Sequence, residues 1–356
     1  MIYGDYNMTR NITFAALFFS LLLSLALPAQ LRKTTETLGV NFQGHRFSSN
    51  GLDRDYYAVA IPLRVAYTPD RYTALTLSFN HGYQSYDGVG LYGVGNLTAG
   101  LRRMLGESFS LQVQGVFPTG TRELEPLKLG TTSAGKIPYI NAPLTYANQG
   151  FGGKGGFAFA RQASESFKFA LGASYTYRGS YTPVLGGSDF DPSDEIQFSA
   201  GVEIGSRESG LIGDVRYSLY DKEKSGGVEI SAPGDAIVAS GQIFLNTLQL
   251  SGLYYDRVAT QFPFGGEFKS PMVINARLAF RLGSRVFIPY VGYEHNGDGD
   301  RILAADVLLV GGYFSNFSPG GFPFAPYLEI KYGDVGPDAS MLGFRVGTAW
   351  SFQMYP

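Results

Sequence analysis

The 356-residue sequence contains no cysteine and little charge, since Asp, Glu, Lys and Arg together make up 16% of it. The absence of cysteine excludes a disulfide framework, a thiolate zinc site and a lipid anchor on an N-terminal cysteine. Average soluble domains carry about 25% charged residues. The formal net charge is −2 and no basic cluster is visible, so nucleic acid is not an expected partner.

Long apolar runs are also missing, except for one at the start of the chain. Ile12–Leu27 follows a basic residue and precedes Pro28 and Ala29. A positive residue, a short apolar run and a small-residue exit are typical of a secretory signal peptide. We expect a signal peptide over residues 1–29, with Met8 as an alternative start. A membrane anchor is the other interpretation, but it needs about 20 apolar residues.

The rest of the chain, residues 30–356, is rich in aromatic residues (15%) and glycine (47 residues) and alternates with a period of two. One face of each predicted strand is apolar, and the other is small or polar. The clearest apolar strips are Tyr57 to Tyr67, Leu75 to Phe79, Phe167 to Tyr177, Ile196 to Ile204 and Leu342 to Phe352, each counted in steps of two. The strands are about 10–13 residues long and end in aromatics, which favours a transmembrane barrel over a soluble sandwich.

The connections between these strands alternate between short and long. Short ones include Thr68–Arg71 and Gly106–Ser108, and the predicted long ones include Ser48–Asp55, Gln84–Tyr92 and Thr119–Asn148. Outer-membrane barrels have short turns at one end and long loops at the other. The sequence therefore predicts an all-β, antiparallel, up-and-down transmembrane barrel of about 12–16 strands, with about sixteen as the best count.

Charged residues within the strands fall on the face opposite the apolar strip, where we expect them to line the lumen. A charge on the lipid-facing side would cost about 2–4 kcal/mol at mid-membrane. The predicted lumen-lining residues are Arg64, Arg102, Lys168, Glu203, Asp214, Arg216, Arg277, Arg281, Glu329, Lys331 and Arg345. They form either a selective polar pathway or a salt-bridged ladder that fills the lumen, with Glu203–Arg216 and Glu329–Arg345 as expected pairs.

The long loop Thr119–Asn148 is a second candidate site, because loops of more than about 15 residues are usually functional or disordered. It either folds into the barrel and narrows it or stays at the surface. Its charged candidates are Arg122, Glu123, Glu125 and Lys128.

Catalytic and metal sites are not predicted, and no cofactor is expected. His45, His81 and His295 are interpreted as residues at the barrel rim, because none has the Ser and carboxylate neighbours of a hydrolase. The oxygen-rich segment Asn296–Asp300 lacks the glutamate of an EF-hand calcium loop, which favours an ordinary hairpin tip. An outer-membrane hydrolase is therefore the weakest interpretation.

One part of the sequence resembles a known group of barrels. The stretches Gly93–Arg102 (GVGNLTAGLR), Leu111–Gly120 (LQVQGVFPTG) and Leu129–Thr131 (LGT) are similar to the outer-membrane family known for meta-pathway phenol degradation, whose members are similar in kind to FadL-type channels. Asn96 stands where that family usually has Asp. The resemblance covers about 40 residues, and it implies a channel without catalytic residues and with no defined cargo.

These features together predict a bacterial outer-membrane channel for passive uptake of small molecules, with hydrophobic or aromatic compounds as candidate cargo. The alternative is a structural or surface-interaction barrel with a plugged lumen. Membrane lipids, lipopolysaccharide and the barrel-assembly machinery are the expected partners, and the solute is unknown.

Overall fold

The computed structural model describes residues 34–120, 123–135, 137, 140, 150–205, 209–270, 272–281, 287–297, 304–314, 325–336 and 338–354. The expected signal peptide lies outside these residues. No helix in the described part of the chain is long and apolar enough to cross a membrane.

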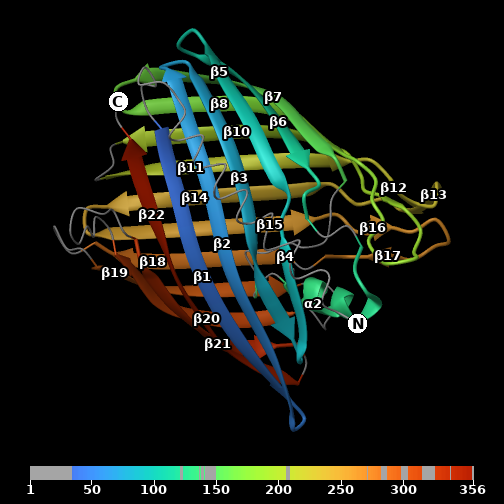
Figure 1. The fold of residues 1–356 in the computed structure, drawn as a ribbon. Coiled ribbons are helices and arrows are strands. Elements are labelled where there is room, and N and C mark those ends of the chain that lie inside the picture. Colours follow the sequence, from blue (N-terminus) through green and yellow to red (C-terminus); the bar gives the residue numbers. More distant parts are fainter. Residues whose placement is uncertain are drawn as a thin grey trace.

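Antiparallel strands form a closed barrel (Figure 1). The first strand, β1, pairs with β2 on one side and with the last strand, β22, on the other, so the sheet has no free edge. The strands β4 and β5 both pair with β3, one after the other, and together fill a single place in the ring. The barrel therefore has 16 strands, which confirms the predicted fold class and the upper end of the predicted count.

The wall strands follow one another along the chain, and each pairs with the next, except that β4 and β5 both pair with β3. They are β1 (Thr34–Ser49), β2 (Leu52–Asp70), β3 (Thr73–Tyr86), β4 (Val89–Val94), β5 (Leu97–Leu105), β6 (Phe109–Phe117), β7 (Gly152–Ser164), β8 (Phe167–Arg178), β10 (Glu195–Gly205), β11 (Ser209–Tyr220), β14 (Ala236–Leu245), β15 (Leu248–Arg257), β18 (Met272–Phe280), β19 (Phe287–Gly297), β20 (Ala305–Phe314), β21 (Tyr327–Val335) and β22 (Ala339–Met354).

Additional elements lie in the connections at one end of the barrel, which we call the loop end. They are the helix α2 (Pro126–Gly135) and the short strands β9 (Phe190–Asp191), β12 (Glu223–Ser225), β13 (Val228–Ser231), β16 (Thr260–Gln261) and β17 (Glu267–Phe268). β9, β12 and β13 make a small sheet of their own that projects from the wall (Figure 1). The opposite end, which we call the turn end, carries Thr34 paired with Met354 and short connections such as Gly106–Ser108.

The two faces of the wall differ as the period of two predicts. Large apolar side chains such as Leu171, Phe198 and Leu342 are exposed on the outer face. Their neighbours in sequence point to the other face, since successive strand residues alternate. Exposed apolar side chains on a barrel face hydrocarbon rather than water, so we assign the outer face to the membrane.

Tyrosines mark the outer face near the loop end, and several of them reach acidic residues at the rim. Tyr217 donates a hydrogen bond to Asp235 at 2.6 Å, and Tyr175 and Tyr293 bond to Asp194 and Asp306. Amphipathic aromatic rings of this kind form the girdles of membrane barrels, where an apolar body meets a polar boundary.

Two of the predicted long loops, Ser48–Asp55 and Gln84–Tyr92, are wrong. The strands on either side run on and meet at two-residue turns, Asn50–Gly51 and Asp87–Gly88. In both turns the two residues have positive φ, at 50° and 77° and at 48° and 79°. That is the type I′ geometry for which Asn-Gly and Asp-Gly are the strongest sequence signals. The prediction missed it because polar residues near the tips looked like loop rather than strand.

Candidate functional site: the lumen and its inserted loop

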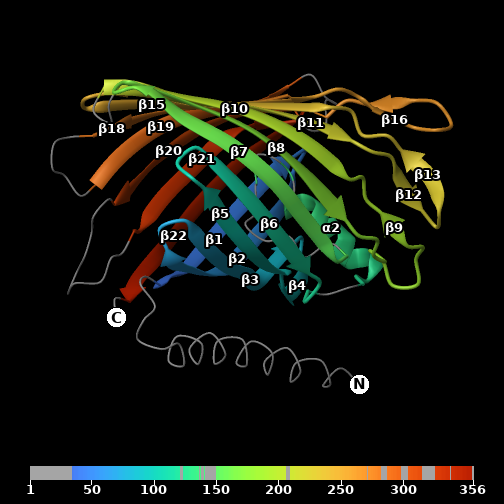
Figure 2. The same cartoon turned by 90° about the horizontal axis from the view of Figure 1, so that it is seen from above.

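The connection between β6 and β7 lies against the inner face of the barrel at the loop end. In Figure 2 its helix α2 lies near β4, and α2 contacts both β3 and β4. The Thr131 hydroxyl donates to the carbonyl oxygen of Val89 at 2.9 Å. Arg345 Nη2, on β22, donates to the carbonyl oxygen of Ile140 at 3.1 Å. The loop is thus tied to distant parts of the wall.

A further tie joins this loop to the connection between β8 and β10. The amide of Leu124 donates to the carbonyl oxygen of Pro183 at 3.1 Å, and the amide of Leu185 donates to the carbonyl oxygen of Leu124 at 3.0 Å. The loop therefore has partners near β8, on β4 and on β22. The described residues of the loop therefore pack against the inner face of the wall.

An apolar cluster holds the loop in place. Its loop members are Leu124, Ala134 and Ile140, and its wall members include Tyr56 and Met341 on the inner face. Burial of each large apolar side chain in this cluster contributes roughly 1.5–3 kcal/mol to the stability of the packed loop. The loop is therefore packed onto the wall formed by β20, β21, β22, β1, β2 and β4.

Beside this cluster, the inner face carries a buried network of charges. Lys331 and Glu329 on β21 are 1% and 2% exposed, and Glu294 on β19 is 7% exposed. Lys331 Nζ lies 2.9 Å from Glu294 Oε2 and 3.8 Å from Glu329 Oε1. Buried ions need partners of opposite sign and further hydrogen bonds, because burial removes their hydration.

Two arginines and two neutral side chains complete the network. Arg277 Nη2 lies 3.3 Å from Glu329 Oε2, and Arg345 Nη1 lies 3.9 Å from Glu329 Oε1. The Tyr290 hydroxyl donates to Glu329 at 2.7 Å, and Asn275 Nδ2 donates to Glu294 at 2.7 Å. Three cations thus surround two carboxylates, and Arg345 also carries the contact with the loop.

The opposite wall, from β5 to β11, is different, because several of its inner charges remain exposed, although Arg178 and Glu195 at the loop end are largely buried. Lys168 pairs with Glu203 at 2.8 Å, and Arg216 pairs with Asp214 at 3.1 Å. Yet the side chains of Lys168 and Arg216 are 47% and 43% exposed although they point into the barrel. The described residues therefore leave open space along this wall.

All the predicted lumen residues lie on the face opposite the exposed apolar strip. The cross-strand register puts Arg64 beside Ser78, Arg102 beside Gln112 and Arg345 beside Gln43. The expected pair Glu329–Arg345 is present, but Glu203 pairs with Lys168 rather than with Arg216. Of the loop candidates, Glu123, Glu125 and Lys128 are described, and Arg122 lies outside the described residues.

Sequence reasoning missed several charged residues of the inner face. The cross-strand register places each of them beside another inward residue; they are Lys154, Arg178, Glu195, Arg257 and Glu294. For Glu294 the alternation in the sequence was a usable signal. Val291 and Tyr293 point outward, so Glu294 falls on the inner face together with Tyr290 and Gly292. Cations outnumber carboxylates on this face, with Arg64, Arg102, Lys154, Lys168, Arg178, Arg216, Arg257, Arg277, Arg281, Lys331 and Arg345 against Glu195, Glu203, Asp214, Glu294 and Glu329.

The histidines are only partly where the sequence placed them. His45 is wrong as a rim residue, because it is 2% exposed on the inner face, packed beside Tyr56. The close approach of Gly343 makes room for it, since a Cβ there would lie 2.3 Å from His45 Nδ1. His295 lies near the rim with Asp306 at 2.8 Å. Among the described residues no group of three or more His, Asp or Glu side chains is placed to hold a metal ion.

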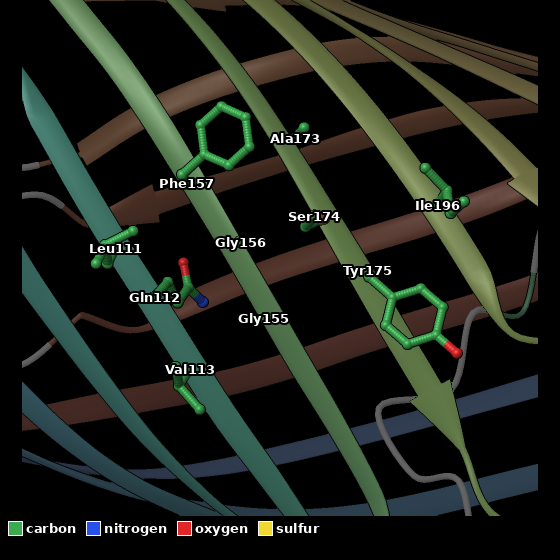
Figure 3. A pocket seen from close by; sticks show the side chains of 10 residues that line it. All are labelled: Leu111, Gln112, Val113, Gly155, Gly156, Phe157, Ala173, Ser174, Tyr175 and Ile196. Carbon is green, nitrogen blue, oxygen red and sulfur yellow. The ribbon is translucent and has the colours of Figure 1, made fainter.

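A groove of about 530 Å³ lies on the outer face, where β7 contributes Gly155 between larger neighbours (Figure 3). Leu111 and Val113 on β6 stand on one side, Tyr175 on β8 stands on the other, and Phe157 closes the groove along β7 itself. Its lining is almost wholly apolar and belongs to the membrane-facing surface, so it is not part of the path through the barrel.

Several solved structures share this barrel fold over most of their length. OpdQ from Pseudomonas aeruginosa is 10% identical with a TM-score of 0.52, over 91% of this chain and 98% of that one. OccK11 (OpdR) from the same organism is 10% identical with a TM-score of 0.51, over 90% and 96%. A mutant of Rh. blastica porin is 12% identical with a TM-score of 0.46, over 90% and 100%. At these identities the likeness shows the fold alone.

No family model matches the sequence, and no curated protein matches it. The resemblance to phenol-degradation and FadL-type barrels is therefore not confirmed and stays a prediction. The chain shares the barrel fold of OpdQ and OccK11.

Proposed function

We propose that this protein is a bacterial outer-membrane channel through which small molecules diffuse passively. The observation that carries the proposal is the exposure of inward charges, such as Lys168 and Arg216, on the wall from β5 to β11. A lumen packed with side chains would bury these groups, as the network around Lys331 is buried. An open polar wall beside an inserted loop is the arrangement of a narrowed aqueous pore.

The cargo follows from the chemistry of that open wall. Its charged and amide side chains favour water-soluble solutes. Hydrophobic or aromatic cargo, which the sequence also suggested, needs apolar surface along the path. The cluster around Leu124 and Ile140 supplies such surface at the loop end. We therefore propose small polar solutes as the main cargo, with aromatic compounds as the second class.

Export by the segment 1–29, insertion by the barrel-assembly machinery and contact with lipopolysaccharide belong to the same proposal. The membrane-facing belt and the tyrosines at the loop end support a membrane location. The rival proposal is a structural or surface-interaction barrel with a plugged lumen, which the packed loop favours.

Liposome swelling separates the two. Proteoliposomes containing the refolded protein should swell in neutral sugars, and the rate should fall as the sugar becomes larger, because the loop narrows the pore. Protein-free liposomes and liposomes with heat-unfolded protein are the controls. Swelling no faster than in these controls, for every sugar tested, would leave the plugged barrel.

A further inference from the structure

We propose that the inner wall carries a binding site for a small organic anion, formed by Arg64 and Arg102. The site is a cavity of about 410 Å³ on the inner face of β2, β3, β5 and β6. Its lining includes the hydroxyls of Thr76, Ser78 and Thr98, and the amides of Gln112 and Gln114 complete its polar surface. This inference rests on the proposed function, since it names the class of solute that the channel prefers.

The register explains how two arginines on separate strands share one cavity. Arg64 is level with Ser78 and Thr98, while Arg102 is level with Ala74 and Gln112, nearer the turn end. Thr76 and Gly100 lie between these levels and face each other. A Cβ at Gly100 would lie 2.7 Å from Thr76 Oγ1, so glycine keeps the floor of the cavity open.

Both guanidinium groups are exposed to the lumen, and within the described part of the chain neither has a carboxylate partner. Most other inner cations have one, such as Arg178 with Glu195 and Arg216 with Asp214. Among the described residues, no carboxylate lies within ion-pair distance of Arg64 or Arg102. Within the described part of the chain, the side-chain contact that Arg102 makes is a weak one, from Nη2 to the sulfur of Met104 at 3.9 Å.

The surroundings add donors and no negative charge. Lys154 lies directly across from Gln114 on the next strand, so a third cation stands at the edge of the cavity. Guanidinium forks match the two oxygens of a carboxylate or a phosphate, and hydroxyl and amide groups donate to the remaining lone pairs. The cavity therefore fits an oxyanion group of a small molecule. A solute that enters at the loop end would reach this cavity after passing the inserted loop.

Binding tests this site without depending on conduction. We would titrate succinate, inorganic phosphate and uncharged succinamide into the refolded protein in detergent at low ionic strength, where charge interactions are least screened. Succinate or phosphate should bind, and succinamide should not. Arg64→Gln and Arg102→Gln should each weaken binding by about tenfold. Arg64→Lys, which keeps the charge, should retain more affinity than Arg64→Gln.

Arg161→Gln is the matched control, because Arg161 lies on the outer face opposite Phe169 and its loss changes the net charge equally. Its affinity for succinate should equal that of the unmodified protein. A preference for phosphate over succinate identifies a phosphorylated solute, and the reverse identifies a carboxylate. Equal binding of succinate and succinamide, or equal affinity in all the variants, would overturn the site while leaving the channel proposal intact.

A current measurement keeps the two proposals separate. In a salt gradient the reversal potential of the open channel should show a preference for anions, and Arg64→Gln together with Arg102→Gln should reduce it. Open channels without this preference contradict the anion site alone. Absence of any current contradicts the channel, and the binding titration then still decides the site.

Discussion

Lys331 Nζ lies 2.9 Å from Glu294 Oε2, and both residues are almost completely buried in the inner wall, on strands separated by β20. The contact ties β19 to β21 across their common neighbour. Replacing Lys331 with Met should destabilise the barrel by about 3–5 kcal/mol, because it leaves Glu294 and Glu329 buried with fewer partners. The readout is the temperature at which the folded band disappears on a semi-native gel.

Lys168→Met is the matched control for this change. Lys168 is also an inward lysine paired with one glutamate, but the pair is exposed to solvent, which screens it. Its loss should change the free energy of unfolding by less than about 1 kcal/mol. Equal shifts for the two variants would contradict the picture of one packed and one open wall.

Leu124 anchors the inserted loop and is 2% exposed. Leu124→Asp should release the loop. An unpaired carboxylate in the apolar cluster costs several kcal/mol, which is about as much as the local packing contributes. We expect faster trypsin cleavage at Lys128 and a larger conductance. Leu127→Asp is the control, since Leu127 lies three residues further along, in the first turn of α2, and is 77% exposed, so the introduced carboxylate would remain in water. If both variants behave alike, the cluster does not hold the loop.

Gly51 sits at the tip of the β1–β2 hairpin with a φ of 77°. Gly51→Val should destabilise this hairpin by about 1–2 kcal/mol, because a residue with a Cβ is strained in the left-handed region. Hydrogen exchange of the amides near Asp53 and Ser48 would report it. Gly155→Ala should leave the stability unchanged or slightly raised, since a Cβ there meets nothing within 4 Å.

The strands of the barrel wall were predicted better from the sequence than the side-chain contacts inside the lumen. Outward strips such as Leu342, Phe344 and Val346 were predicted from alternation, since each strand repeats the same local pattern. The tight turn Asn50–Gly51 was missed although its signal was local. The contact of Gln43 with Arg345 joins residues 302 positions apart, and no local pattern specifies it.

The inserted loop shows the same limit. Its length predicted a role, but not which wall it packs on, because that depends on complementary surfaces that form only when the barrel closes. Leu124, Thr131 and Ile140 each meet a different part of the structure. The partner of Glu203 was misassigned for a related reason, since neighbours on both sides of a strand compete for the same side chain.

Single-channel conductance of the refolded protein in a planar bilayer distinguishes an open pore from a closed barrel. We expect steady open steps, because the exposed inner charges on the wall from β5 to β11 indicate water along the barrel. The steps should become larger in Leu124→Asp and stay unchanged in Leu127→Asp. Silence from a correctly folded, heat-modifiable sample would contradict the open pore and indicate a lumen closed by the loop.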